Sequence, residues 1–162
     1  MGRRFWIEAG KSWVTGRELI EDRPKENIFR VNRAAFTDTD LFEREMSEIF
    51  DRCWLYLGHE SQVRAHGDYF ATRLGRHPVF VIRGSDGRIG CFYDACSHRG
   101  SRLTGRTSGN AKTLVCRYHG WCFNADGACT LVRGGDEAYR AADLDRMGTD
   151  LLPIEQFAEY KC

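Results

Sequence analysis

Two short motifs contain the residues best suited to chemistry in this sequence, because each pairs a cysteine with a histidine. Cys96 and His98 are separated by one residue and Cys116 and His119 by two, with seventeen residues between His98 and Cys116. Each motif offers one thiolate sulfur and one imidazole nitrogen, which are ligands for transition metals. The spacing predicts two loops between strands that hold a metal centre between them.

A [2Fe-2S] cluster fits this set of four ligands. We expect Cys96 and Cys116 to bind one iron, and His98 and His119 to bind the other. Two neutral imidazoles leave the cluster with less negative charge than four thiolates would, so we expect it to be reduced more easily. A glycine follows each ligand segment, and a residue without Cβ lets backbone N–H groups approach the sulfurs and stabilise the electron-rich form. These glycines are Gly100 and Gly120.

A structural zinc site is the alternative for the same four residues, since two cysteines and two histidines also suit tetrahedral zinc. Zinc modules favour C-x2-4-C and H-x3-5-H pairings, whereas this sequence has C-x-H and C-x2-H, so the spacing favours the iron-sulfur cluster. The other cysteines and histidines lack ligand spacing, and we interpret them as free thiols and as surface or structural histidines. They are Cys53, Cys91, Cys122, Cys129, Cys162, His59, His66 and His77.

Composition limits the remaining classes of function. The chain has 162 residues, of which 42% are hydrophobic and 29% charged, and this fits one folded domain. A formal net charge of +1 gives no reason to expect nucleic acid or a membrane surface as partner. No apolar run approaches the roughly 18 residues of a membrane-spanning helix, and the first residues lack the apolar core of a signal peptide, so we expect a cytoplasmic location. Seven cysteines in such a chain indicate metal ligation and free thiols.

The elements that must position the ligand motifs follow Cys53. Short stretches rich in β-branched and aromatic residues are separated there by turns that contain glycine, a pattern typical of antiparallel strands. We expect hairpin turns at residues 75–76, 85–87 and 125–127, because glycine supplies the positive φ that tight connections require. The predicted fold class is mainly β, a small antiparallel sandwich or barrel. The expected strands cover residues 54–58, 68–74, 78–83, 88–93, 114–117, 121–124 and 128–132.

The part of the chain before residue 53 has a different pattern of apolar residues. Residues 1–36 form an N-terminal arm without clear periodicity, whose apolar side chains either cover the core of the domain or dock on a partner. Residues 37–52 predict an amphipathic helix, in which Thr37 and Asp40 resemble a capping box. Residues 53–162 then form the metal-binding domain. The apolar residues are Phe5, Trp6, Trp13 and Val14 in the arm, and Phe42, Met46, Ile49 and Phe50 on one face of the helix.

The ligand motifs and their neighbours resemble the Rieske iron-sulfur motif, and the chain is similar to the Rieske domain of aromatic ring-hydroxylating dioxygenase large (alpha) subunits. The resemblance is carried by residues 96–100 and 116–121, and extends over 54–62, 75–79 and 123–127. Within the family, residues 59–62 and 68–69 are closest to enzymes of the benzoate and related aromatic-acid type. The resemblance implies an antiparallel Rieske-type sandwich or barrel with one [2Fe-2S] cluster. The residues that it implies around the cluster are Arg99, Gly100, Tyr118, Gly120 and Trp121.

The same resemblance implies a low reduction potential. Rieske proteins of respiratory complexes have cysteines, joined by a disulfide, where this sequence has Ser101 and Tyr118, and a hydroxyl donor to a cluster sulfur where it has Trp121. Without that donor we expect a potential near the low end of the Rieske range, about −150 mV, which suits electrons at the level of a ferredoxin. Basic residues around the ligands either steer an acidic ferredoxin or are scattered solvated charges. They are Arg99, Arg102, Arg106, Lys112 and Arg117.

Resembling enzymes oxygenate their substrate at a mononuclear Fe(II) held by two histidines and a carboxylate, in a domain that follows the Rieske part. No histidine follows His119 in this sequence, so we do not expect this chain alone to oxygenate. We interpret it as truncated before that catalytic domain, because the family begins a last apolar strand after the pair at residues 160–161. Either the polypeptide is a fragment or an early-terminated product, or another chain supplies the rest.

The expected function is therefore electron relay within an oxidoreductase of aromatic hydrocarbon catabolism. The chain would take electrons from a ferredoxin or reductase and pass them to the mononuclear iron of a neighbouring oxygenase subunit, with a small beta subunit as a further partner. Two alternatives stay open. A free-standing Rieske-type ferredoxin shares the cluster but is not expected to carry the features of residues 1–50, and a structural zinc module has no redox role.

Overall fold

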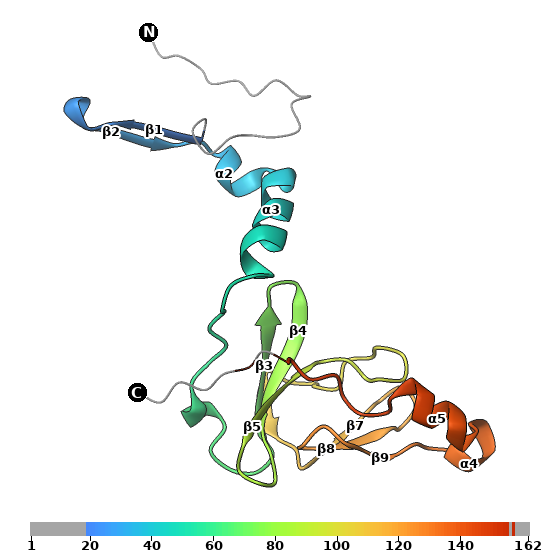
Figure 1. Cartoon of the computed structure of the whole chain (residues 1–162). Coiled ribbons are helices and arrows are strands. Elements are labelled where there is room, and N and C mark those ends of the chain that lie inside the picture. The colour runs from blue at the N-terminus through green and yellow to red at the C-terminus, as the bar shows by residue number, and fades with distance from the viewer. Residues whose placement is uncertain (1–18, 156, 158–162) are drawn as a thin grey trace. The chain divides into compact units, whose positions relative to one another are not determined.

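A computed structural model describes residues 19–155 and residue 157 (Figure 1). The chain divides into two units, Met1–Trp54 and Leu55–Cys162, which are taken in turn. The four apolar side chains singled out in the N-terminal arm, at positions 5, 6, 13 and 14, lie outside the described residues, as does the strand expected after residues 160–161. No helix within the described ranges is long and apolar enough to cross a membrane.

The first unit begins with a β-hairpin that the sequence pattern did not predict. Strands β1 (Ile20–Arg23) and β2 (Ile28–Val31) pair antiparallel across the 3-10 turn η1 (Pro24–Glu26). Asn27 completes the turn with a φ of 53°, in the left-handed region that asparagine tolerates better than most residues. Proline at the start of the turn and asparagine at its end are the local signals for this hairpin.

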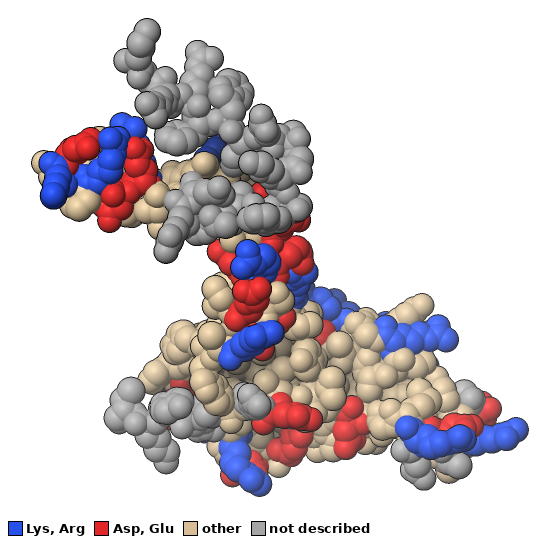
Figure 2. All heavy atoms as spheres, turned by 45° about the horizontal axis from the view of Figure 1, so that its top comes forward, with Lys and Arg blue, Asp and Glu red and all other residues tan. Residues whose placement is uncertain are grey.

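Acidic and basic side chains are interspersed on the face shown in Figure 2, in keeping with the formal net charge of +1. On the hairpin, the Glu21 carboxylate lies 2.7 Å from the guanidinium of Arg23 and 3.5 Å from that of Arg30. Solvent screens such pairs, so each contributes little to stability. The hairpin therefore depends more on its backbone ladder than on these charges.

The helix predicted over residues 37–52 begins two residues later than expected, and a separate short helix precedes it. Helix α2 (Ala34–Thr37) is followed by α3 (Thr39–Glu45) and by one π-helical turn, η2 (Met46–Phe50). The break lies at Asp38, whose ψ of 124° is extended, so that α2 ends there and α3 begins.

Thr37 does not cap this helix, contrary to the sequence prediction. The Asp38 carboxylate accepts a hydrogen bond from the Leu41 N–H at 2.8 Å and so satisfies one of the free donors of the first turn of α3. The Thr37 hydroxyl instead donates to the Arg33 carbonyl at 3.3 Å. On the predicted apolar face Met46 is buried, whereas the other three side chains are 38% to 49% exposed. These three are Phe42, Ile49 and Phe50.

Two antiparallel sheets contain the described strands of the second unit (Figure 1). One has the strand order β5-β4-β3-β6 and the other the order β7-β8-β9. The strands are β3 (Asp68–Leu74), β4 (His77–Arg83), β5 (Ile89–Tyr93), β6 (Ser108–Asn110), β7 (Thr113–Val115), β8 (Cys122–Asn124) and β9 (Cys129–Leu131). The remaining elements are the 3-10 turn η3 (Glu60–Gln62) and the helices α4 (Gly135–Ala138) and α5 (Ala141–Met147).

The predicted class, mainly β and antiparallel, is confirmed. The strand expected at residues 54–58 is wrong, because this segment pairs with no strand, and Trp54 and Tyr56 are 66% and 84% exposed. Strand β6 was not predicted, because Ser-Gly-Asn has no β-forming side chain. It forms through backbone pairing with β3, in which Asn110 lies opposite Asp68. The Asn110 side-chain amide adds hydrogen bonds to the Asp68 carboxylate at 2.8 Å and to the His66 carbonyl at 3.0 Å.

Strand β4 buries side chains on both of its faces, which explains why its sequence is a continuous apolar run. Phe80 and Ile82 belong to one core cluster, which also contains both ligand cysteines. Val79 and Val81 belong to a second cluster, because successive side chains of a strand point to opposite faces. The ligand loops are thus anchored in the same core as the sheet.

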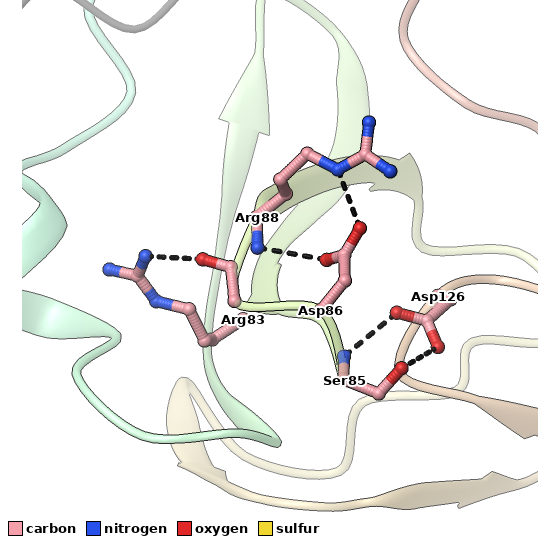
Figure 3. A network of polar contacts seen from close by, with 6 residues as sticks. Arg83, Ser85, Asp86, Arg88 and Asp126 are labelled. Atoms are coloured by element: carbon pink, nitrogen blue, oxygen red, sulfur yellow. Dashed lines mark hydrogen bonds and ion pairs between the residues drawn. The ribbon is translucent and has the colours of Figure 1, made fainter.

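A polar contact joins the turn between β4 and β5 to the turn between β8 and β9 (Figure 3). The Ser85 N–H and hydroxyl donate to the two carboxylate oxygens of Asp126, at 2.8 and 2.7 Å. Within the first turn, Asp86 accepts a hydrogen bond from the Arg88 N–H at 2.9 Å. The two sheets are therefore linked by side chains at these turns as well as through the core.

Candidate metal centre

The two ligand motifs lie on loops that follow β5 and β7 and share one backbone pattern. In the first loop, the Gly100 N–H donates to the Cys96 carbonyl and the Cys96 N–H to the Ser101 carbonyl, both at 2.8 Å. The second loop repeats both bonds. The Gly120 N–H donates to the Cys116 carbonyl at 2.9 Å, and the N–H of that cysteine donates to the carbonyl five residues on at 2.8 Å. Two copies of one turn therefore present the four candidate ligands.

Each turn requires a glycine at its fifth position. Gly100 has a φ of 68° and Gly120 a φ of 75°, a region that side chains with a Cβ rarely adopt. This conformation lets the two N–H groups before each glycine point at the sulfur of the loop's own cysteine. The donors are His98 and Arg99 for Cys96, and Tyr118 and His119 for Cys116.

The two candidate thiols are buried and hydrogen-bond to each other. Burial raises the pKa of Cys96 above its ordinary value. In Cys116 the same effect of burial is outweighed by hydrogen bonds from backbone N–H groups, the Cys96 thiol and the Ser101 hydroxyl, and its pKa lies below the ordinary value. Such donors stabilise a thiolate, which is the form that binds iron.

The two candidate imidazoles also lie together, with 4.7 Å between their ring centroids. The Nε2 atom of His98 lies 2.9 Å from the hydroxyl of Tyr139, which leaves its Nδ1 for a metal. Burial, followed by the charges of His119 and Arg99, lowers the pKa of His98 and so favours the neutral ring that metals require.

His119 offers a buried nitrogen that is suited to a metal. Its Nδ1 atom is buried and has no hydrogen-bond partner among the residues that the structure describes. A buried polar atom without a partner costs free energy, and coordination to iron through Nδ1 removes this cost. The donor set and this unpartnered nitrogen both fit the predicted metal group.

The donors are sorted by type, thiol beside thiol and imidazole beside imidazole. A mixed-ligand [2Fe-2S] cluster needs this arrangement, since each iron takes one pair. Within residues 19–155 and 157, no three His, Cys, Asp or Glu side chains converge as a single metal ion would require. Tetrahedral zinc needs four donors around one ion, so the geometry favours the cluster over the zinc site that the sequence left open.

Aromatic rings enclose the imidazole pair. Trp121 is 1% exposed and stacks on His98, with 4.8 Å between the centroids and 6° between the planes. Tyr118 is 60% exposed and lies against His119, with a centroid distance of 3.8 Å. An open pocket of about 630 Å³ borders both histidines, and Arg133 contributes to its lining.

Residues 53–143 match the family model of the Rieske [2Fe-2S] domain. The chain belongs to this family. Family membership implies one [2Fe-2S] cluster, as the sequence predicted. We assign as its ligands the four residues that the two similar loops bring together, Cys96, His98, Cys116 and His119.

Relatives that are named as dioxygenase subunits match this chain over most of its length. The toluate 1,2-dioxygenase subunit alpha of Pseudomonas putida is 41% identical over 144 residues, which are 88% of this chain and 32% of the relative. The 2-halobenzoate 1,2-dioxygenase large subunit of Burkholderia cepacia is 38% identical over 143 residues, 88% of this chain and 31% of the relative. The chain therefore spans about a third of the length of these relatives.

Solved structures show the same fold. A naphthalene 1,2-dioxygenase with indole bound in its active site matches with a TM-score of 0.69 and 36% identity, over 76% of this chain and 27% of that one. A naphthalene 1,2-dioxygenase from Rhodococcus sp. bound to indole gives a TM-score of 0.71 and 29% identity, over 80% of this chain and 29% of that one. The predicted Rieske-type fold is thereby confirmed.

Three residues at this Rieske site were not predicted to act there as they do. Tyr139 contacts His98 from 41 residues away in the sequence, so no local spacing predicts this contact. Ser101 was noted only as a position without cysteine, yet its hydroxyl bonds the Cys116 sulfur. Asp94 is 1% exposed and accepts hydrogen bonds from the backbone N–H groups of Leu103 and Thr104, beyond the first ligand loop. The only signal for this role was a carboxylate two residues before a candidate ligand. His59, by contrast, caps η3 as a structural histidine, accepting from the Ser61 N–H at 3.2 Å.

Proposed function

We propose that this chain is the electron-relay domain of an aromatic ring-hydroxylating dioxygenase large subunit. It takes one electron at a time from a ferredoxin or reductase and passes it to a mononuclear iron outside this chain. The observation that carries the proposal is the pairing of Cys96 with Cys116 and of His98 with His119 on two identical turns. The relatives named above, all dioxygenases or their subunits, supply the biological setting.

The residues of the chain divide the work of such a relay. When bound, a [2Fe-2S] cluster takes up and releases one electron at a potential set by its ligands and by hydrogen bonds to them. Burial of the two cysteines excludes water from the sulfur side, and the loop N–H groups stabilise negative charge there. The imidazole side is less buried, and beside it lies the open pocket. Electrons enter and leave on this side, where the distance to a partner is shortest.

The charge around the pocket fits an acidic electron donor. Arg117 and Arg133 line the pocket, and Arg99 is exposed on the first loop. Arg102, which the sequence placed in the same basic group, instead lies 3.3 Å from the buried Asp94 carboxylate. We therefore assign steering of a ferredoxin to Arg99, Arg117 and Arg133. We expect the rate of electron transfer to fall as salt is added.

We assign an aromatic carboxylate as the substrate class of the whole enzyme, as the resemblance of residues 59–62 and 68–69 to enzymes of the benzoate type suggested. Two relatives, at 41% and 38% identity, are named for toluate and 2-halobenzoate, which are aromatic carboxylates. A third, at 40% identity, is named for benzene. The two relatives named for aromatic carboxylates agree with the resemblance of residues 59–62 and 68–69, and they support the assignment.

Stopped-flow reduction of the reconstituted chain tests the proposal. The chain is loaded with iron and sulfide without oxygen, and the oxidised protein is mixed with a reduced ferredoxin or a reduced reductase. We expect the visible absorbance of the cluster to decrease in wild type and in a His66→Ala control, whose exposed side chain lies outside both loops. His119→Ala should form no Rieske cluster. A wild-type protein that binds zinc and no iron would contradict the proposal.

A further inference from the structure

The hydroxyl of Tyr139 lies 2.9 Å from Nε2 of His98. Tyr139 is half-buried and follows α4 directly, where its φ of −135° and ψ of 142° end the helix. The turn at the end of α4 thus brings a phenol to the outer nitrogen of one candidate ligand. None of the family motifs in the two loops includes this residue.

Two aromatic rings, which also pack against each other, hold the His98 ring. Its face stacks on Trp121, and Tyr139 packs edge-on against it, with 6.0 Å between centroids and 88° between planes. Tyr139 also packs edge-on against Trp121 at 6.0 Å and 82°. With the face, the edge and Nε2 of the ring engaged, Nδ1 is the nitrogen left to bind iron.

The surroundings of the two candidate histidines differ. His119 has its Nδ1 buried without a partner among the described residues, and its ring lies against the exposed Tyr118. His98 has a half-buried tyrosine hydroxyl on its outer nitrogen. A ligand imidazole bound through Nδ1 carries its proton on Nε2, so His98 donates this proton to the phenolic oxygen.

We propose that Tyr139 is a positioning residue that fixes the orientation of His98 and strengthens it as an electron donor to iron. A hydrogen bond from the outer N–H of a metal-bound histidine raises the basicity of the ring. A more basic ligand stabilises the oxidised iron, so Tyr139 lowers the reduction potential of the cluster. This inference rests on the proposed function, since it requires the cluster to bind at these four residues.

Redox titration of the reconstituted chain tests this role in wild type, Tyr139→Phe and Tyr69→Phe. Tyr139→Phe keeps the ring and removes the hydroxyl, and we expect full cluster content with an equilibrium constant for reduction raised about fivefold, the order expected for one lost hydrogen bond. Tyr69→Phe removes a hydroxyl from the same core cluster and should leave the potential unchanged. An unchanged potential in Tyr139→Phe with full cluster content overturns the role of Tyr139 alone.

A measurement on wild type decides the matter if Tyr139→Phe assembles no cluster. Pulsed EPR of the reduced protein should resolve two unequal nitrogen couplings, because among the described residues a phenolic hydroxyl bonds to His98 and none bonds to His119. Two equal couplings overturn the role of Tyr139. A wild-type chain that takes up no iron and sulfide overturns the proposed function and this inference with it.

Discussion

The carboxylate of Asp94 binds Thr104 twice, through the backbone N–H at 3.0 Å and through the side-chain hydroxyl. It also accepts the Leu103 N–H at 2.9 Å, and it is 1% exposed. Asp94 precedes the first ligand loop and residues 103–104 follow it. One buried carboxylate therefore closes the base of the loop that presents Cys96 and His98.

Asp94→Ala should destabilise the fold by about 3 kcal/mol, because it leaves the buried Leu103 N–H and the half-buried Thr104 N–H without their acceptor. Asp94→Asn keeps one amide oxygen for these donors, and we expect a loss nearer 1 kcal/mol. Urea unfolding of both variants at one pH measures the two values. A change below about 0.5 kcal/mol in Asp94→Ala would show that the carboxylate does not hold the loop.

Gly127→Ala should be more destabilising than Gly87→Ala, although both glycines follow aspartate in a hairpin turn. Their φ angles are 88° and 82°, so backbone strain is nearly equal, at about 1 to 2 kcal/mol. A Cβ at Gly127 overlaps the ring of Phe92, whereas a Cβ at Gly87 meets no atom within 4 Å. Thermal unfolding separates the two effects, and equal losses in melting temperature would contradict the close packing of Phe92.

The Cys91 thiol should resist alkylation in the native protein. Burial raises its pKa to about 12, so only about one molecule in ten thousand carries the reactive thiolate at pH 8. Cys53 is exposed and should react with iodoacetamide first. Peptide mass spectrometry follows the two sites, and a Cys53→Ala variant serves as control. Labelling of Cys91 as fast as that of Cys53 would mean that the second core cluster opens readily.

The strands that the sequence predicted are those whose signal is local. Strand β3 covers the expected residues 68–74, because a stretch of β-forming residues ends there at a glycine turn. The prediction missed strand β6 and wrongly placed a strand at residues 54–58. The first forms because β3 offers a free edge to Ser108–Asn110, and the second has β-forming residues but pairs with no strand. Both depend on partners that residue types cannot reveal.

The same division holds for the metal site. The candidate ligands and both loop glycines could be named from the sequence, because each lies within five residues of its cysteine along one loop. Tyr139 and Asp94 could not be assigned their roles, since these depend on contacts that the tertiary fold creates. Thr37 shows a smaller failure of the same kind: the neighbouring Asp38 was an equally good cap, and the backbone selected it.

Mössbauer spectroscopy of the chain reconstituted with iron-57 and sulfide tests the central claim most directly. The account predicts that the oxidised protein gives two doublets of equal area, one for an iron with thiolate ligands from Cys96 and Cys116 and one for an iron with imidazole ligands from His98 and His119. A single doublet, as four equivalent thiolates produce, or a protein that holds zinc in place of iron, would contradict it.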